Sequence, residues 1–202
     1  MKAKPLYYVI FGLAAIALIF LGWRVYAASY RYQGSQIDPP APAADFTLTN
    51  QDGQSFTLSQ QRGKLDLIFF GYTNCPDICP ITLTTFARVR KSLGDQADNV
   101  RFIFVTVDPE RDTAEQIKTH LSHFDPAIIG LTGTRAELEP VWKDYGVFQS
   151  SHESADLAHY DVDHSSRIYV VDAQGNWRMT YPAEMDWQAI VSDVQHLLKE
   201  KG

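Results

Sequence analysis

The chain has 202 residues, of which 45% are hydrophobic and 21% are charged, and its formal net charge is −6. This composition is typical of a globular protein with one domain and ample apolar material for a core. Beyond residue 28 the chain holds fifteen Lys and Arg against twenty-four Asp and Glu, a formal net charge of −9. We therefore expect no nucleic acid partner, because nucleic-acid-binding domains present clustered basic residues.

An uncharged apolar run occupies the N-terminus. It extends from Pro5 to Trp23, which is about enough helix to cross a bilayer core of ~30 Å. Lys2 and Lys4 precede the run, so the positive-inside rule keeps the short N-terminus in the cytoplasm and exports the rest. The small-residue pattern ending at Ala27 would also suit a cleaved signal peptide, but the run is longer than a typical signal sequence. We predict that residues 1–28 are a retained transmembrane anchor, with the signal peptide as the alternative.

The segment that follows, residues 29–44, is polar and then proline-rich, with no periodicity. This composition predicts a flexible tether between the membrane and the folded part of the chain. We accordingly expect the folded domain to cover residues 45–202.

Strand and helix patterns alternate along this domain. Two capping boxes, Asp112-x-x-Glu115 and Thr134-x-x-Glu137, predict the starts of two helices. Alternating strands and helices predict an α/β fold, a mixed and largely parallel sheet flanked by helices. In chain order the other expected elements are a hairpin around Gln51-Asp52-Gly53, a buried strand at 65–71, a helix at 81–93, strands at 100–108 and 128–133, a hairpin at 167–181 and a last helix from Asp186.

Both cysteines of the chain, Cys75 and Cys79, lie in the stretch GYTNCPDICP, directly after the strand predicted at 65–71. The C-terminal edge of the strands is where sites form in open α/β sheets. Because Pro80 suits the first position of a helix, we expect Cys79 to be the N-cap residue. The unpaired N–H groups and the helix dipole would then stabilise a thiolate. The arrangement predicts two accessible sulfurs with lowered pKa values.

The spacing of the two thiols is compatible with three uses. A structural disulfide suits an exported protein, but so short a loop would stabilise the fold little. Thiol–disulfide exchange is the second use, although its more direct signature would be C-x-x-C. The wider C-x-x-x-C spacing also leaves room for a metal ion, and two thiolates suit Cu(I) or Zn. A metal site would need a third ligand.

His164 is the histidine best placed to be that third ligand. It precedes the strand predicted at 167–171, and Asp163 comes directly before it. If this strand lies beside strand 65–71, His164 would face the cysteines, and a neighbouring carboxylate could orient its imidazole. The other histidines are expected to be surface or packing residues on helices (His120, His123, His196) or solvated loop residues (His152, His159).

Three stretches, GYTNCPDICP, VTVDPERDT (105–113) and YDVDHSSRIYVVD (160–172), closely resemble the Sco/SenC family. The resemblance covers the chain from about Asp45 to its end. It implies a membrane-tethered, thioredoxin-like copper protein that helps to assemble the CuA site of cytochrome c oxidase. The implied location is the inner membrane of a bacterium, single pass, with the C-terminal domain in the periplasm.

Carried over by position, the resemblance implies that Cys75, Cys79 and His164 are copper ligands and that Asp163 supports the histidine. Asp77, between the cysteines, also matches the family pattern, and we expect it to have a turn or local electrostatic role and not to be a ligand. In VDPERDT we expect Asp112 to cap a helix and Asp108, Pro109 and Arg111 to shape a turn. A thioredoxin-like reductase would have a cis-proline where this chain has Asp163-His164-Ser165, a difference that favours metal binding.

Three functions follow from these residues. The first is a copper metallochaperone, whose partners would be the CuA-bearing oxidase subunit, a copper donor chaperone and a thioredoxin-like reductase. The alternative is a thiol–disulfide oxidoreductase in which Cys75 and Cys79 are the catalytic residues and reduce the cysteines of an exported protein. The third is a copper or redox sensor that has no client protein.

Overall fold

The computed structural model describes residues 4–27, 30–151, 162–164 and 166–200. The chain divides into two units, residues 1–32 and residues 33–202. The first unit contains helix α1 (Lys4–Ala27), whose described large apolar side chains, from Tyr7 to Phe20 and at Trp23, are exposed, that of Phe11 by 77%. Within the described part of the chain, no helix combines the length and the hydropathy needed to cross a membrane. The anchor stays a prediction of the sequence.

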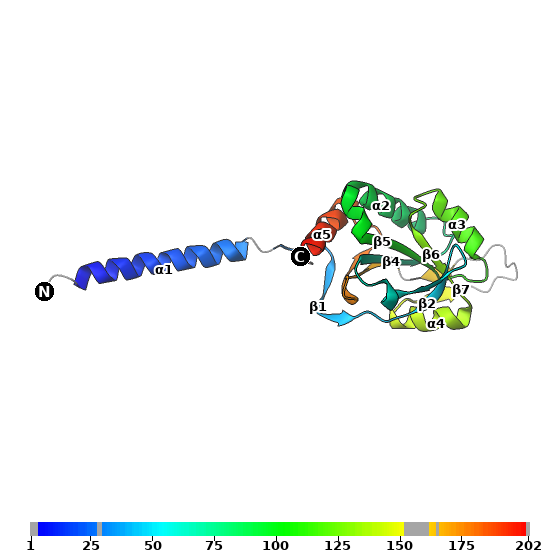
Figure 1. Cartoon of the computed structure of the whole chain (residues 1–202), viewed down its shortest axis with the longest axis horizontal. Helices are drawn as coiled ribbons and strands as arrows, with labels where there is room; N and C mark the ends of the chain where they lie inside the picture. The colour runs from blue at the N-terminus through cyan, green and yellow to red at the C-terminus, as the bar shows by residue number, and fades with distance from the viewer. Residues whose placement is uncertain (1–3, 28–29, 152–161, 165, 201–202) are drawn as a thin grey trace. The chain divides into compact units, whose positions relative to one another are not determined.

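A mixed sheet of eight strands forms the centre of the second unit, in the order β1-β10-β9-β4-β5-β6-β2-β3 (Figure 1). The pairs β4–β5 and β5–β6 are parallel, and the other neighbouring pairs are antiparallel. The mixed α/β sheet is therefore confirmed, but it is less parallel than expected. Its strands are β1 (Ser35–Pro42), β2 (Thr47–Asn50), β3 (Ser55–Thr57), β4 (Leu65–Gly71), β5 (Val100–Thr106), β6 (Ile129–Thr132), β9 (Arg167–Val171) and β10 (Asn176–Pro182).

Strands β4 and β5 lie in the middle of this sheet and form much of the core. All seven residues of β4 are buried, and Phe69 and Phe70 have no exposed surface. A strand that is covered on both faces needs apolar side chains on both faces, so its sequence is a nearly continuous apolar run, here interrupted only by Asp66. This is why the sequence pattern located β4 correctly.

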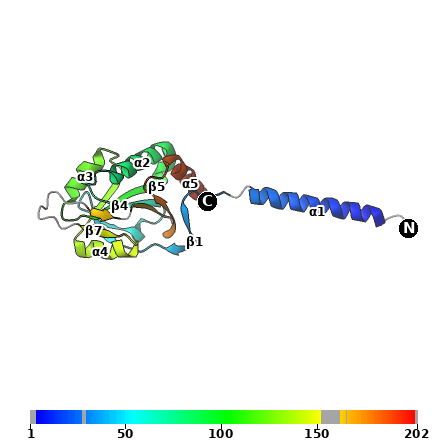
Figure 2. The same ribbon diagram turned by 180° about the vertical axis from the view of Figure 1, so that it is seen from behind.

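Helices cover both faces of the sheet, with α2, α3 and α5 on one face and α4 on the other, as Figure 1 and Figure 2 show. On the first face, the ring of Phe86 packs against that of Phe102 with centroids 5.3 Å apart. On the second, Trp142 donates its indole N–H to the carbonyl of Thr106 at 3.1 Å. The helices are α2 (Ile78–Leu93), α3 (Ala114–Ser122), α4 (Arg135–Asp144) and α5 (Trp187–Glu200), with short 3₁₀ turns η1 (Leu58–Gln61) and η2 (Gly94–Asn99).

The two predicted helix caps have different outcomes. Thr134 caps α4 and forms a capping box with Glu137, as expected. Helix α3, however, begins one residue later than predicted, because Thr113 is its N-cap and Gln116 completes the capping box. The prediction that Asp112 caps a helix is wrong, and its carboxylate is directed elsewhere.

The predicted tether over residues 29–44 also differs from the structure. Residues 35–42 form strand β1, which pairs with β10 at the edge of the sheet. The carboxylate of Asp193, a fully buried residue of α5, accepts hydrogen bonds from the N–H groups of Gln33 (2.9 Å) and Gly34 (3.0 Å). These bonds and the pairing with β10 hold a stretch whose composition resembles a linker, so the folded unit begins well before Asp45.

Candidate metal centre

The two cysteines lie between the C-terminal end of β4 and the first turn of α2. Cys79 has no exposed surface and Cys75 is 9% exposed, and both are present as thiols. A hydrogen bond joins the two side chains, so the sulfurs are neighbours. Gly71, the last residue of β4, makes room for them, because a Cβ atom there would lie 2.8 Å from the sulfur of Cys79.

The start of α2 differs from the sequence prediction, and so does the state of its thiol. Asp77 is the N-cap residue, and Cys79 lies within the first turn, before Pro80. The hydrogen bond with Cys75 and burial raise the pKa of Cys79 far above that of an ordinary thiol. The expectation of accessible sulfurs is therefore wrong, and so is the expectation of a lowered pKa for Cys79.

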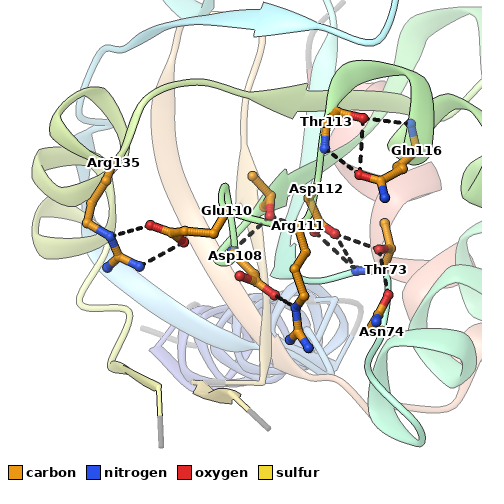
Figure 3. A network of polar contacts seen from close by, with 10 residues as sticks. Thr73, Asn74, Asp108, Glu110, Arg111, Asp112, Thr113, Gln116 and Arg135 are labelled. Atoms are coloured by element: carbon orange, nitrogen blue, oxygen red, sulfur yellow. Dashed lines mark hydrogen bonds and ion pairs between the residues drawn. The ribbon is translucent and has the colours of Figure 1, made fainter. Parts of the chain in front are cut away.

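The loop that carries Cys75, residues 72–77, is here called the cysteine loop and is held by the carboxylate of Asp112 (Figure 3). Asp112 accepts hydrogen bonds from the backbone N–H of Thr73 (3.1 Å) and from its hydroxyl (2.5 Å). The hydroxyl of Thr106, the last residue of β5, donates to the same carboxylate at 2.7 Å. Asp112 therefore links the cysteine loop to the neighbouring parallel strand, a role that the sequence analysis missed.

A second contact between the same two loops involves Arg111. Its guanidinium lies over the ring of Tyr72, 5.8 Å from the centroid, and its Nε donates to the carboxylate of Asp108 at 2.5 Å. The carbonyl of Asp108 accepts the N–H of Asp112, which closes the turn that we expected here. The turn following β5 therefore packs against the cysteine loop and supports it. The parallel pairing of β4 with β5 could have indicated this, because it brings the two loops to one edge of the sheet.

The backbone of His164 belongs to the same region of the fold. Strand β8 (Val162–His164) pairs with β7 (Gln149–Ser151) and is followed closely by β9. Strand β9 runs antiparallel to β4, with Ile168 opposite Phe69, so β9 begins near the C-terminal end of β4. The side chains of Asp163 and His164 are outside the described part of the structure. Among the described residues, no group of three or more His, Cys, Asp and Glu is arranged to hold a metal ion.

The other histidines have the following places. His120 and His123 line a surface pocket beside Thr73 and Asn74, next to the cysteine loop. The ring of His120 packs against Phe124, with centroids 5.3 Å apart, and burial lowers the pKa of His120. His196 lies 3.6 Å from Glu200 on α5, whereas His152 and His159 are outside the described residues.

The fold and the site define a class, the thioredoxin-like α/β proteins with two adjacent thiols at a strand–helix junction. Known proteins identify the class further. The SCO1/SenC family profile matches residues 34–199, and the chain belongs to this family. The resemblance drawn from the sequence motifs is therefore confirmed.

Individual relatives agree with this assignment. A SCO2-like protein of Rickettsia conorii is 39% identical over 134 residues, which make up 66% of this chain and 65% of the relative. The copper-bound structure of Bradyrhizobium japonicum ScoI is 38% identical, has a TM-score of 0.72 and covers 78% of this chain and 99% of its own. BsSco, described as a member of the Sco family of cytochrome c oxidase assembly proteins with a disulfide switch, is 26% identical, has a TM-score of 0.64 and covers 84% of this chain and 98% of its own.

Proposed function

We propose that this protein is a copper metallochaperone that helps to assemble the CuA site of cytochrome c oxidase. Its cargo would be bound by Cys75, Cys79 and His164, with Asp163 orienting the imidazole. The observation that carries the proposal is the pair of hydrogen-bonded thiols at the C-terminal end of β4, the edge near which β9 begins. A relative of the same fold has been solved with copper bound.

The chemistry of these donors suits copper. Two thiolates and one imidazole are soft and borderline ligands that match Cu(I), and an added ligand would support Cu(II). Because the pKa of Cys79 is raised, metal binding must displace its proton, so affinity increases with pH. Oxidation of the two thiols to a disulfide releases two protons and two electrons and removes two ligands together. Copper occupancy and disulfide formation therefore exclude each other.

Copper titration of the full-length reduced chain in detergent tests the proposal. We expect about one Cu(I) per chain, measured by competition with a chromophoric chelator. Cys75→Ala and Cys79→Ala should abolish tight binding. His164→Ala should weaken it by at least about tenfold, since loss of a ligand costs more than loss of a group that supports one.

The matched control is His196→Ala, which removes an imidazole from α5. It should leave the copper affinity unchanged. If His164→Ala also binds copper as tightly as the unmodified chain, His164 is not a ligand. If the unmodified chain binds no copper, the metallochaperone proposal fails.

A second candidate is a thiol–disulfide oxidoreductase that reduces the cysteines of an oxidase subunit or another exported protein. The observation that favours it is the presence of two adjacent thiols on a thioredoxin-like fold. In this reaction a client disulfide accepts two electrons and two protons from Cys75 and Cys79, which become a disulfide. Reduction of a client that survives His164→Ala but not Cys75→Ala would favour this candidate over the first.

We also propose that residues 1–28 anchor the protein in the inner membrane of a bacterium, with the folded unit in the periplasm. The uncharged run from Pro5 to Trp23 and the exposed apolar side chains of α1 support this. The expected partners are the CuA-bearing oxidase subunit, a copper donor chaperone and a thioredoxin-like reductase. N-terminal sequencing of the mature protein tests the anchor, because a start at Ala28 would indicate a cleaved signal peptide.

A further inference from the structure

Asp112 is fully buried, and its carboxylate does not cap α3. Its contacts extend beyond its own turn. Its backbone is held from two sides, because its N–H donates to the carbonyl of Asp108 (2.9 Å) and its carbonyl accepts the hydroxyl of Thr132 (2.9 Å). Its side chain accepts three donors, the hydroxyl of Thr106 and both the hydroxyl and the N–H of Thr73 (Figure 3). These hydrogen bonds fix the position of Asp112, which in turn holds the cysteine loop through Thr73.

Burying this group is costly. Burial raises the pKa of Asp112, while the hydrogen bonds from Thr73 and Thr106 oppose that rise. Three donors converge on an acceptor, an arrangement that suits the ionised carboxylate. If packing were its only role, an apolar residue at this buried position would stabilise the fold more.

Two backbone hydrogen bonds at the cysteine loop and the start of α2 are long. The N–H of Cys75 donates to the carbonyl of Tyr72 at 3.3 Å, and that of Ile81 to the carbonyl of Asp77 at 3.5 Å. The side chain of Asp77 makes no capping bond to the helix that follows. The hydrogen bond from the Thr73 hydroxyl to Asp112 is short, at 2.5 Å, and lies two residues before Cys75.

We propose that Asp112 is a positioning residue for the metal site, and that it acts through Thr73 to hold Cys75 beside Cys79. The inference rests on the proposed copper binding. Metal sites lose affinity when the groups that orient their ligands are removed, commonly by about 10- to 100-fold. A loop released from Asp112 would have to be ordered again by the metal, and affinity would fall for that reason.

Thr73 offers a matched set of variants, because it is only half-buried and its substitution should leave the fold intact. Thr73→Val keeps the shape of the side chain but removes the hydroxyl, and Thr73→Ser keeps the hydroxyl. Thr132→Val is the control, because Thr132 is also half-buried and also donates to Asp112, but to its backbone carbonyl. Asp112→Ala removes the carboxylate itself.

The experiment measures Cu(I) affinity by chelator competition and stability by urea unfolding, both on the full-length reduced chain in detergent. We expect Asp112→Ala to lose about 10- to 100-fold in affinity and Thr73→Val about tenfold. Thr73→Ser and Thr132→Val should bind copper like the unmodified chain, although Thr132→Val should lose about as much stability as Thr73→Val. Rescue by serine separates positioning from a general loss of stability.

Two results would overturn the inference while leaving the proposed function intact. One is unchanged copper affinity in Thr73→Val, and the other is an equal loss of affinity in Thr132→Val. Should Asp112→Ala not fold, the three threonine variants still decide the matter. Absence of copper binding by the unmodified chain would refute the proposed function and this inference together, an outcome that the first titration identifies.

Discussion

Gly71→Ala is the substitution whose effect on the site can be worked out most directly from the structure. Gly71 ends β4 and is fully enclosed, and a Cβ atom there would lie 2.8 Å from Cys79 Sγ, 2.8 Å from Phe69 Cε1 and 3.0 Å from Phe104 Cε2. Ordinary contacts between such atoms are about 3.5 Å or more. All three neighbours belong to residues with no exposed surface, so none can move away into solvent.

The expected cost follows from this overlap. Adding a methyl group to a packed core costs about 1–3 kcal/mol. A chain of this size loses about 2–4 °C of melting temperature for each kcal/mol, so we expect a decrease of about 2–12 °C. Since the sulfur of Cys79 is among the displaced atoms, copper affinity should fall as well.

Thermal unfolding of the reduced full-length chain in detergent, followed by circular dichroism, measures the first effect, and chelator competition measures the second. Gly133→Ala is the control, because its new Cβ would meet the exposed carboxylate of Glu137 at 3.0 Å and Leu48 at 3.2 Å, longer distances than at Gly71, and neither residue is a predicted ligand. It should cost less stability and leave copper affinity unchanged. If Gly71→Ala has the same melting temperature and the same copper affinity as the unmodified protein, the reasoning is refuted.

Two further predictions concern a buried ion pair and a protonated thiol. Arg101 contacts Asp66 at 2.6 Å, with side chains 12% and 4% exposed, so Arg101→Ala should lower the free energy of unfolding by about 3–5 kcal/mol in urea titrations. Lys118→Ala breaks the exposed pair with Asp52 and should change the free energy of unfolding little. Equal losses in the two variants would contradict this account. Because the pKa of Cys79 is raised in the folded chain, less thiolate is present at a given pH, and alkylation at pH 8 should be slower in the native chain than in urea. The folded state holds this proton more tightly, so stability is complete below the ordinary thiol pKa of about 8.5 and declines as pH rises above it; stability that instead increases there would be inconsistent with the shift.

Features that depend on neighbours in the sequence were predicted well. Strand β4 was located correctly because a buried strand requires a nearly continuous apolar run. The capping box of Thr134 and Glu137 was found because both partners lie within one helical turn. The cysteine pair and its place after β4 were visible for the same reason.

Features that depend on contacts between distant segments were missed. Strand β1 looked like a linker, because its composition does not show that β10 offers it a free edge. Asp112 looked like a helix cap, because the hydroxyl of Thr73 belongs to another loop of the fold. The helix dipole was expected to lower the pKa of Cys79, but burial and the neighbouring thiol raise it.

The sequence by itself determined the family to which this chain belongs. Two thiols with a fixed short spacing, and a distant D-H-S motif before a strand, were enough to indicate that family, and the resemblance in turn predicts a copper site. Only the tertiary structure decided how the thiols are held and in which protonation state. Candidate ligands can be predicted from motifs in the chain, whereas burial, hydrogen-bond partners and pKa values arise when segments far apart in the chain come together.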